Sequence, residues 1–135
     1  MDLLTALAFP TLVAFSVVFL VFHILLQGTL ATRELGPEWN AGPRDDDKKP
    51  KGELAGRAER ASQNFRETYP AFVGLALGLA IADPASVLGH AGALLWFLAR
   101  LVYIPLYMRG IPYIRSMVWL VSLVGLALMF IALVW

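Results

Sequence analysis

Four long apolar segments dominate this chain and restrict it to a small set of folds. They occupy residues 3–26, 61–82, 87–108 and 112–134, and each is near the ~20 residues that a helix needs to cross a bilayer. Charged residues make up only 16% of the 135, below the roughly 25% usual in soluble domains. Because lipid offers the backbone no hydrogen-bond partners, such spans are helical. The sequence therefore predicts an all-α membrane protein, a single domain over residues 1–135 that forms a four-transmembrane-helix bundle.

The basic residues predict how this bundle lies in the membrane. All eleven Lys and Arg lie in or beside two places, the connection at residues 27–54 and the short connection before the fourth segment. The second connection and both termini carry none. By the positive-inside rule, the first and third connections are cytoplasmic and both termini lie on the non-cytoplasmic side. The first segment has no basic region before it and no small-residue cleavage site after it, so we expect a span and not a cleaved signal peptide.

Composition excludes several kinds of chemistry. The chain contains no Cys, so we expect no disulfide and no cysteine nucleophile, and any thiol must arrive with a ligand. His23 and His90 cannot make a metal site on their own, and His23 is interpreted as a hydrogen-bonded or interfacial residue. The aspartates at residues 45–47 belong to a charged run that is typical of a solvated loop. A net charge of +1 without a basic stripe gives no indication of a nucleic-acid partner.

A polar stripe leads into the second apolar segment. The chain is predicted to be helical from Glu53 to Ala82, with a kink at Pro70. On this helix, four polar side chains fall within roughly 80° of one another. They are Arg57, Arg60, Asn64 and Glu67. Ionisable groups inside a membrane are costly, so the stripe indicates a functional site.

Further polar residues are expected at the same depth. Arg100, Tyr103 and Tyr107 share one face of the third segment at the spacing i, i+3, i+7, and the fourth segment opens with Arg115 and Ser116. A polar cluster in a membrane is stable only when it faces inward or faces another subunit. We therefore expect these groups to meet the stripe in the cytoplasmic half of the bundle. The other half is almost purely apolar and is predicted to hold Trp96, Trp119 and Trp135.

The side-chain types indicate what this zone could bind. Arginines can hold carboxylates bidentately or stabilise a nearby anion, Glu67 can receive an ammonium group, and Gln63 and Asn64 suit amides. A ligand with two carboxylates, an ammonium and two peptide bonds would satisfy this set. Glutathione has that shape and brings the thiol that the chain lacks. A second interpretation stays open, in which Arg and Glu side chains simply pair across helices to fix the packing.

Two stretches of the sequence resemble the MAPEG family, the membrane-associated proteins of eicosanoid and glutathione metabolism. Residues 57–72 read RAERASQNFRETYPAF and resemble the signature of the family's second helix. Residues 99–109 read ARLVYIPLYMR and resemble the third helix of its leukotriene C and prostaglandin E synthase members. Arg115 and Ser116 match an arginine and a serine of the fourth helix. The resemblance covers most of the chain from Arg57 onward.

The resemblance implies a homotrimer that binds glutathione between neighbouring subunits. One subunit would supply the polar stripe and its neighbour the residues of the third and fourth helices. Arg115 would stabilise the glutathione thiolate, and Arg33 could match a basic residue after the first helix. The predicted catalytic residues are Arg115 and Tyr107, and the predicted glutathione-binding residues are Arg60, Gln63, Asn64, Glu67, Arg100, Tyr103 and Ser116.

The expected function is that of a glutathione-dependent transferase or peroxidase that activates the thiolate for attack on lipophilic electrophiles or hydroperoxides. Conjugation, peroxide reduction and isomerisation all use such a thiolate and stay open. Gln63 stands where prostaglandin-forming members carry an arginine, and the family also contains a non-catalytic lipid-binding protein, so a lipid-binding or scaffold trimer is the alternative. A proton-coupled exporter is disfavoured, because the first segment holds no acid beyond Asp2. The lack of cysteines and the short loops fit a bacterial inner membrane.

Overall fold

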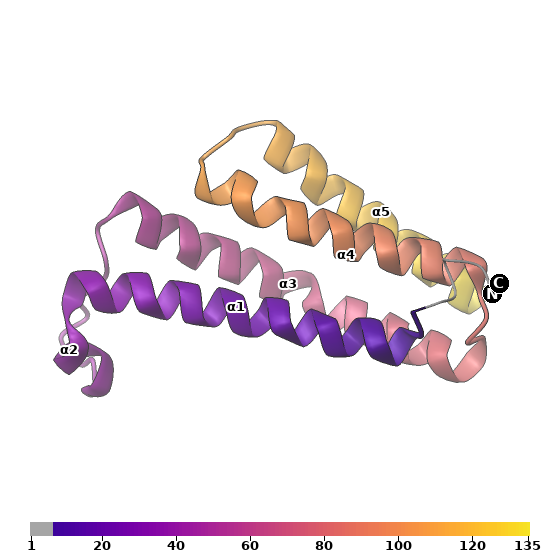
Figure 1. Ribbon diagram of the computed structural model, residues 1–135, viewed down its shortest axis with the longest axis horizontal. Coiled ribbons are helices and arrows are strands. Elements are labelled where there is room, and N and C mark those ends of the chain that lie inside the picture. Colours follow the sequence, from indigo (N-terminus) through magenta and orange to yellow (C-terminus); the bar gives the residue numbers. More distant parts are fainter. Residues whose placement is uncertain (1–6) are drawn as a thin grey trace.

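The computed structural model describes residues 7–135, and these residues form five helices. Their order is α1 (Phe9–Leu35), α2 (Pro37–Ala41), α3 (Glu53–Ala82), α4 (Val87–Met108) and α5 (Ile114–Val134) (Figure 1). The described residues contain no strand. The prediction of an all-α architecture is therefore confirmed for this part of the chain.

The first helix differs most from its predicted bounds of 3–26. It begins at Phe9 with Pro10 in its first turn, where a proline is tolerated because no intrahelical N–H bond is lost. Residues 3–6 of the prediction lie outside the described residues. At the other end the helix continues to Leu35 and stops at Gly36, whose φ of 94° suits only glycine well. The predicted connection 27–54 therefore begins as helix, includes the short α2, and is irregular only from Gly42 to Gly52.

Three helices are long and apolar enough to cross a membrane by length and composition, namely α1, α4 and α5. The sequence also predicted a span at residues 61–82, which lie within α3, but α3 is not among these three helices. Its charged side chains, including Arg66 and Glu67 inside the apolar segment, reduce its mean hydropathy. The helix is nevertheless 30 residues long and continuous through Pro70. Large apolar side chains are exposed along the other helices, for example Leu25 on α1 and Met117 on α5, as expected for an integral membrane protein.

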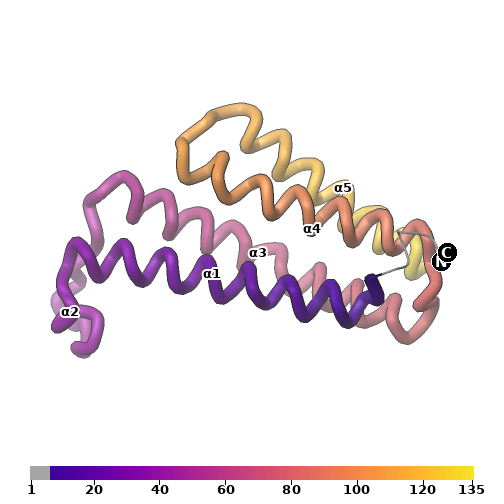
Figure 2. Tube along the Cα trace, in the orientation of Figure 1, coloured from indigo at the N-terminus to yellow at the C-terminus, as the bar shows by residue number. Residues whose placement is uncertain are grey.

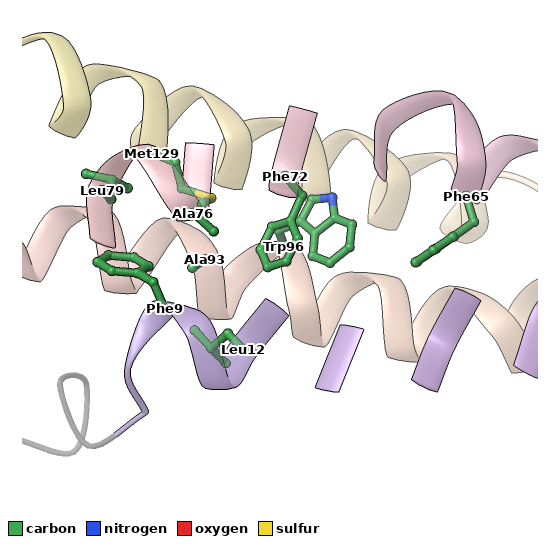
Figure 3. Packing of buried hydrophobic residues seen from close by; sticks show 9 residues of the cluster. All are labelled: Phe9, Leu12, Phe65, Phe72, Ala76, Leu79, Ala93, Trp96 and Met129. Carbon is green, nitrogen blue, oxygen red and sulfur yellow. The ribbon is translucent and has the colours of Figure 1, made fainter. Parts of the chain in front are cut away.

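The helices form two pairs, α1 with α3 and α4 with α5. The pairs lie close together near the start of α1 and the end of α5, and they diverge toward the end that carries α2 and the α4–α5 connection (Figures 1 and 2). We call this second end the basic end, because Arg33, Arg44, Arg57 and Arg109 lie there. A buried core joins the pairs, with the Phe72 ring stacked on Trp96 at 3.8 Å between ring centres. Figure 3 shows the full set, which is Phe9, Leu12, Phe65, Phe72, Ala76, Leu79, Ala93, Trp96 and Met129.

Two glycines allow α4 and α5 to approach very closely. A Cβ atom built at Gly92 would lie 2.6 Å from the main-chain oxygen of Gly125, and one at Gly125 would lie 2.7 Å from that of Gly92. Small residues at a helix contact bring backbones together and increase the van der Waals contact on which packing in membranes depends. The α4–α5 pair is therefore a rigid hairpin.

The turn between α4 and α5 has an unusual backbone. Gly110 has φ +67° and Tyr113 has φ 58° and ψ −62°, while the Ile114 N–H donates to the Pro112 carbonyl at 2.7 Å. These values define a γ-turn of the rare positive-φ kind, centred on Tyr113. Because of this turn, α5 starts at Ile114, two residues after the predicted start at 112.

A side chain from α1 anchors the far end of the long connection. Glu34 accepts hydrogen bonds from the main-chain N–H groups of Lys51 (2.5 Å) and Gly52 (3.0 Å). Gly52 is the N-cap of α3 and offers no capping side chain, and Glu34 bonds the N–H of this residue and of the residue before it. This contact fixes where α3 begins relative to the end of α1.

Candidate functional site

A pocket of about 420 Å³ lies between the diverging helix pairs toward the basic end. Residues from α3, α4 and α5 line it, so three helices that are distant in sequence contribute to one site. The lining residues are Arg60, Gln63, Asn64, Glu67, Tyr103, Tyr107, Arg115, Ser116 and Trp119. Its volume falls in the range of about 300–1,000 Å³ typical of small-molecule sites.

The structure brings together every residue that the sequence singled out for the site, with the exception of Arg100. The residues of α3 and those of α4 and α5 line this pocket within one chain. Sequence reasoning missed Trp119, which it placed in the apolar half of the bundle. Trp119 is one helical turn beyond Arg115 and Ser116, so the spacing i+4 from Arg115 would have put it on the same face.

Tyr107 lies between two arginines. Arg60 Nε donates to the Tyr107 hydroxyl oxygen at 3.2 Å, and the Arg115 guanidinium lies 4.6 Å from the centre of the Tyr107 ring. Tyr103 is the next ring along α4, with 5.5 Å between the two ring centres. Since the oxygen of Tyr107 already accepts a hydrogen bond, its own O–H is available to donate to a ligand.

The charged residues of the pocket do not pair with one another. Among the described residues, the ion pairs are Lys48–Asp46 at 3.4 Å and Arg57–Glu53 at 3.6 Å, and neither involves a lining residue. The structure therefore does not show the alternative interpretation, in which Arg and Glu side chains of the stripe pair with each other across helices. Unpaired charges in a pocket are the groups that an ionic ligand can satisfy.

Arg100 lies behind the pocket and not on its surface. Its side chain is 1% exposed, and Nη1 donates to Asn64 Oδ1 at 2.8 Å. The prediction placed it with the ligand-binding arginines because it shares a helix face with Tyr103 and Tyr107. Arg100 lies farther from the basic end along α4, where α3 and α4 pack together, while the two tyrosines lie nearer the end at which the helix pairs diverge (Figure 1).

Two other residues have different surroundings from those predicted. His23 is 1% exposed and packs on the Phe65 ring with 4.9 Å between ring centres, and neither ring nitrogen has a partner within residues 7–135. It is therefore a core residue, so its interpretation as hydrogen-bonded or interfacial was wrong. Arg33 lines a separate hollow beside Glu34 and the start of α3, and it does not reach the pocket.

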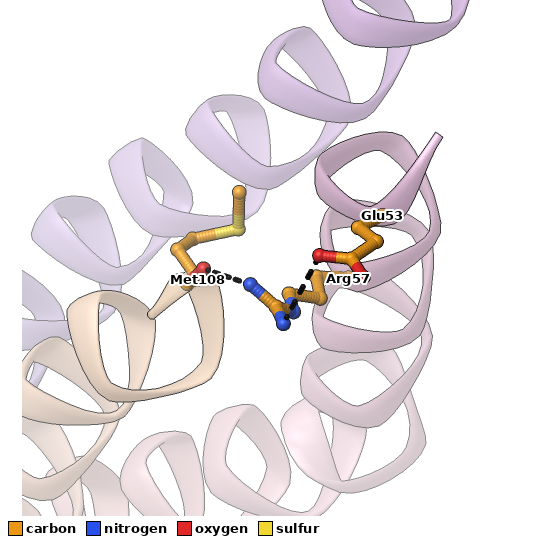
Figure 4. A network of polar contacts seen from close by, with 3 residues as sticks. All are labelled: Glu53, Arg57 and Met108. Carbon is orange, nitrogen blue, oxygen red and sulfur yellow. Dashed lines mark hydrogen bonds and ion pairs between the residues drawn. The ribbon is translucent and has the colours of Figure 1, made fainter. Parts of the chain in front are cut away.

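Arg57 joins the start of α3 to the end of α4. Its Nη1 donates to the main-chain carbonyl of Met108 at 3.2 Å while Nη2 lies 3.6 Å from Glu53 (Figure 4). Gly110 has φ +67°, a conformation that favours glycine, and a Cβ atom there would lie 2.7 Å from Arg57 Nη2, so the flexible Arg57 side chain would have to shift. The contact fixes the open side of the pocket, since Tyr107 immediately precedes Met108.

We expect Arg57→Ala to loosen this junction, because a carbonyl at the end of α4 would lose its side-chain donor. The free energy of unfolding should fall by about 1–2 kcal/mol, and residues 109–113 should become more susceptible to limited proteolysis. The matched control is Arg44→Ala, because Arg44 is exposed and its side-chain contacts are local, a hydrogen bond to Asn40 and a cation–π contact with the Trp39 ring. Equal changes in both variants, measured by thermal denaturation in detergent, would contradict the role given to Arg57.

Comparison with known proteins places the chain in a family. The family model described as the MAPEG family matches residues 8–135, nearly the whole chain and all of the residues that line the pocket. Among curated proteins and among solved structures, no significant match is found. The match extends the resemblance, which began at Arg57, through the first helix and the long connection. The chain therefore belongs to the MAPEG family.

Proposed function

We propose that this protein is a glutathione-dependent transferase or peroxidase of the membrane. One observation carries the proposal: a pocket in a MAPEG chain gathers unpaired cations, a carboxylate, amides and hydroxyl groups from three helices. Charged side chains that form no ion pair with one another do not stabilise a contact that only packs helices together.

The charges of the pocket suit glutathione. The tripeptide carries two carboxylates, one ammonium group and two peptide bonds. Arg60 can hold a carboxylate, Glu67 can receive the ammonium group, and the amides of Gln63 and Asn64 can bond the peptide groups. Arg115 then remains for the thiol, with the hydroxyl of Tyr107 beside it. The pocket's formal charge of +1, from two arginines and one carboxylate, complements the tripeptide's negative charge.

Arg115 and Tyr107 are the residues that we assign to the chemistry. A guanidinium and a hydroxyl donor next to a sulfur favour the thiolate over the thiol, and the thiol proton passes to water. In conjugation the thiolate attacks an electrophilic carbon, a C–S bond forms, and the leaving group or adjacent double bond takes the electron pair. In peroxide reduction the thiolate attacks the O–O bond, giving an alcohol and a sulfenic acid that a second glutathione converts to a disulfide and water.

The same proposal includes an orientation in the membrane, a host membrane and an oligomeric state. Basic residues cluster at the end where the pocket lies, so this end faces the cytoplasm under the positive-inside rule and the termini face the other side. A bacterial inner membrane would be the host, and lipophilic acceptors would arrive from its hydrocarbon phase. We propose a homotrimer, in which neighbouring subunits would cover the exposed apolar surfaces and complete the pocket.

Glutathione binding to the purified protein in detergent tests this function. Wild type should bind glutathione, and Glu67→Gln should weaken the affinity by about tenfold or more, because a charge-assisted hydrogen bond to the ammonium group is lost. Glu59→Gln is the matched control, since Glu59 is an exposed carboxylate on the same helix that does not line the pocket. Retained lipid binding without any affinity for millimolar glutathione would instead support the lipid-binding scaffold.

A further inference from the structure

Arg100 is a buried cation that contacts the pocket only through other side chains. Its guanidinium lies 4.7 Å from the centre of the Tyr103 ring and 5.4 Å from that of Phe65. Nη1 donates to Asn64 Oδ1, and within the described part of the chain neither Nε nor Nη2 has a hydrogen-bond partner. Asn64 and Tyr103 both line the pocket, so Arg100 supports its wall from behind.

Stability alone does not account for this arginine. A buried charge is costly unless it is paired and fully hydrogen-bonded, and Arg100 has one hydrogen bond and two aromatic faces. An apolar side chain of similar length would fill the same space without that cost. An apolar side chain could supply neither the hydrogen bond to Asn64 nor the cation–π contacts with Tyr103 and Phe65, and of these only the hydrogen bond orients a polar group that lines the pocket.

This hydrogen bond determines which way the Asn64 amide points. A guanidinium has only donors, so it can pair with the amide oxygen and not with the NH₂ group. With Oδ1 held by Arg100, Nδ2 is the group that remains for a ligand. The pocket therefore presents a donor at this point, and a donor takes a carbonyl or carboxylate oxygen. Without Arg100, the amide could turn over and present either group.

We propose that Arg100 is a positioning residue that makes Asn64 a hydrogen-bond donor in the pocket, where it recognises a carbonyl or carboxylate oxygen of a peptide ligand. This inference rests on the proposed glutathione-binding function. It names the residue that determines whether Asn64 presents a hydrogen-bond donor or an acceptor to the ligand. Arg100 acts through Asn64 and does not touch the ligand itself.

A double-variant cycle on glutathione affinity tests the coupling. Arg100→Met should lower the affinity by about tenfold, the equivalent of one hydrogen bond. Asn64→Ala should cause at least as large a loss. The double variant should bind no more weakly than Asn64→Ala, because without the amide Arg100 has nothing left to orient. If Arg100→Met lowers the affinity by the same factor in both backgrounds, the two residues act independently and the proposal is wrong.

Two further variants separate positioning from folding. Asn64→Asp keeps an acceptor for Arg100 but removes the donor, so it should lose about tenfold in affinity while circular dichroism and thermal denaturation stay at least as good as in wild type. Arg100→Lys keeps a donor for Asn64 and should remain within about threefold of wild type. A loss with Arg100→Lys as large as that with Asn64→Asp would overturn the proposal. If wild type itself does not bind glutathione, the proposed function fails, and this inference fails with it.

Discussion

Replacing Arg115 with alanine is expected to abolish formation of the glutathione thiolate at neutral pH. The guanidinium lies over the Tyr107 ring, 4.6 Å from its centre, and it forms no ion pair with a carboxylate among the described residues. Removing one group that stabilises a developing anion typically lowers kcat by about 10²–10³-fold. Ultraviolet difference absorbance at the thiolate band and the rate of conjugation to a lipophilic electrophile should therefore fall together.

Arg109→Ala is the control for this result. It removes the same charge six residues earlier, at the end of α4, but Arg109 is exposed and does not line the pocket, so thiolate formation should stay within a factor of about two of wild type. Arg115→Lys should retain part of the signal, because it keeps the charge but not the planar donor. An unchanged thiolate band in Arg115→Ala would show that another group activates the thiol.

The largest loss of stability is expected from Gly92→Ala. The added Cβ would lie 2.6 Å from the Gly125 oxygen and 2.9 Å from the Met129 nitrogen, and main-chain atoms cannot rotate away as a side chain does. Overpacking of this kind costs about 1–3 kcal/mol, and the upper part of that range applies because both contacts are to backbone. The midpoint of thermal or detergent-induced unfolding should fall accordingly, and the α4–α5 pair should separate.

Gly74→Ala is the matched control, since Gly74 is a helical glycine of α3 with no atom within 4 Å of its added Cβ. This variant should be as stable as wild type or more so, because alanine favours a helix by about 1 kcal/mol over glycine. If both substitutions lower the unfolding midpoint equally, the close approach of α4 and α5 does not limit stability.

Local sequence signals predicted helix ends well where they were strong. The observed bounds of α3 and α4 equal the predicted ones, because Asp83 and Pro84 stop one helix and Arg109 and Gly110 stop the other. The end of α1 was harder to predict, since Gln27 to Leu35 is polar and contains Gly28, which disfavours a helix, yet the helix continues to Leu35. The start of α5 depended on a γ-turn that no residue type signals.

Helical periodicity predicted which residues line the pocket better than it predicted what each residue does there. Arg60, Asn64 and Glu67 of the stripe meet the tyrosines of α4 in one pocket, because their spacing fixes a common face on each helix. Arg100 shares that face in sequence, but its burial depends on how α3 packs against α4, which spacing does not contain. The Arg57 contact with Met108 likewise could not be predicted from the sequence, because it joins residues from two helices through a main-chain carbonyl.

The γ-turn at Tyr113 holds the α4–α5 connection in a strained backbone conformation. A non-glycine residue in such a backbone costs about 1–3 kcal/mol, and Tyr113 offsets little of this by packing, since its side chain is 82% exposed. A glycine at this position would adopt the same angles without steric conflict. The connection is thus the place where the protein could be made more thermostable without altering a single residue of the pocket.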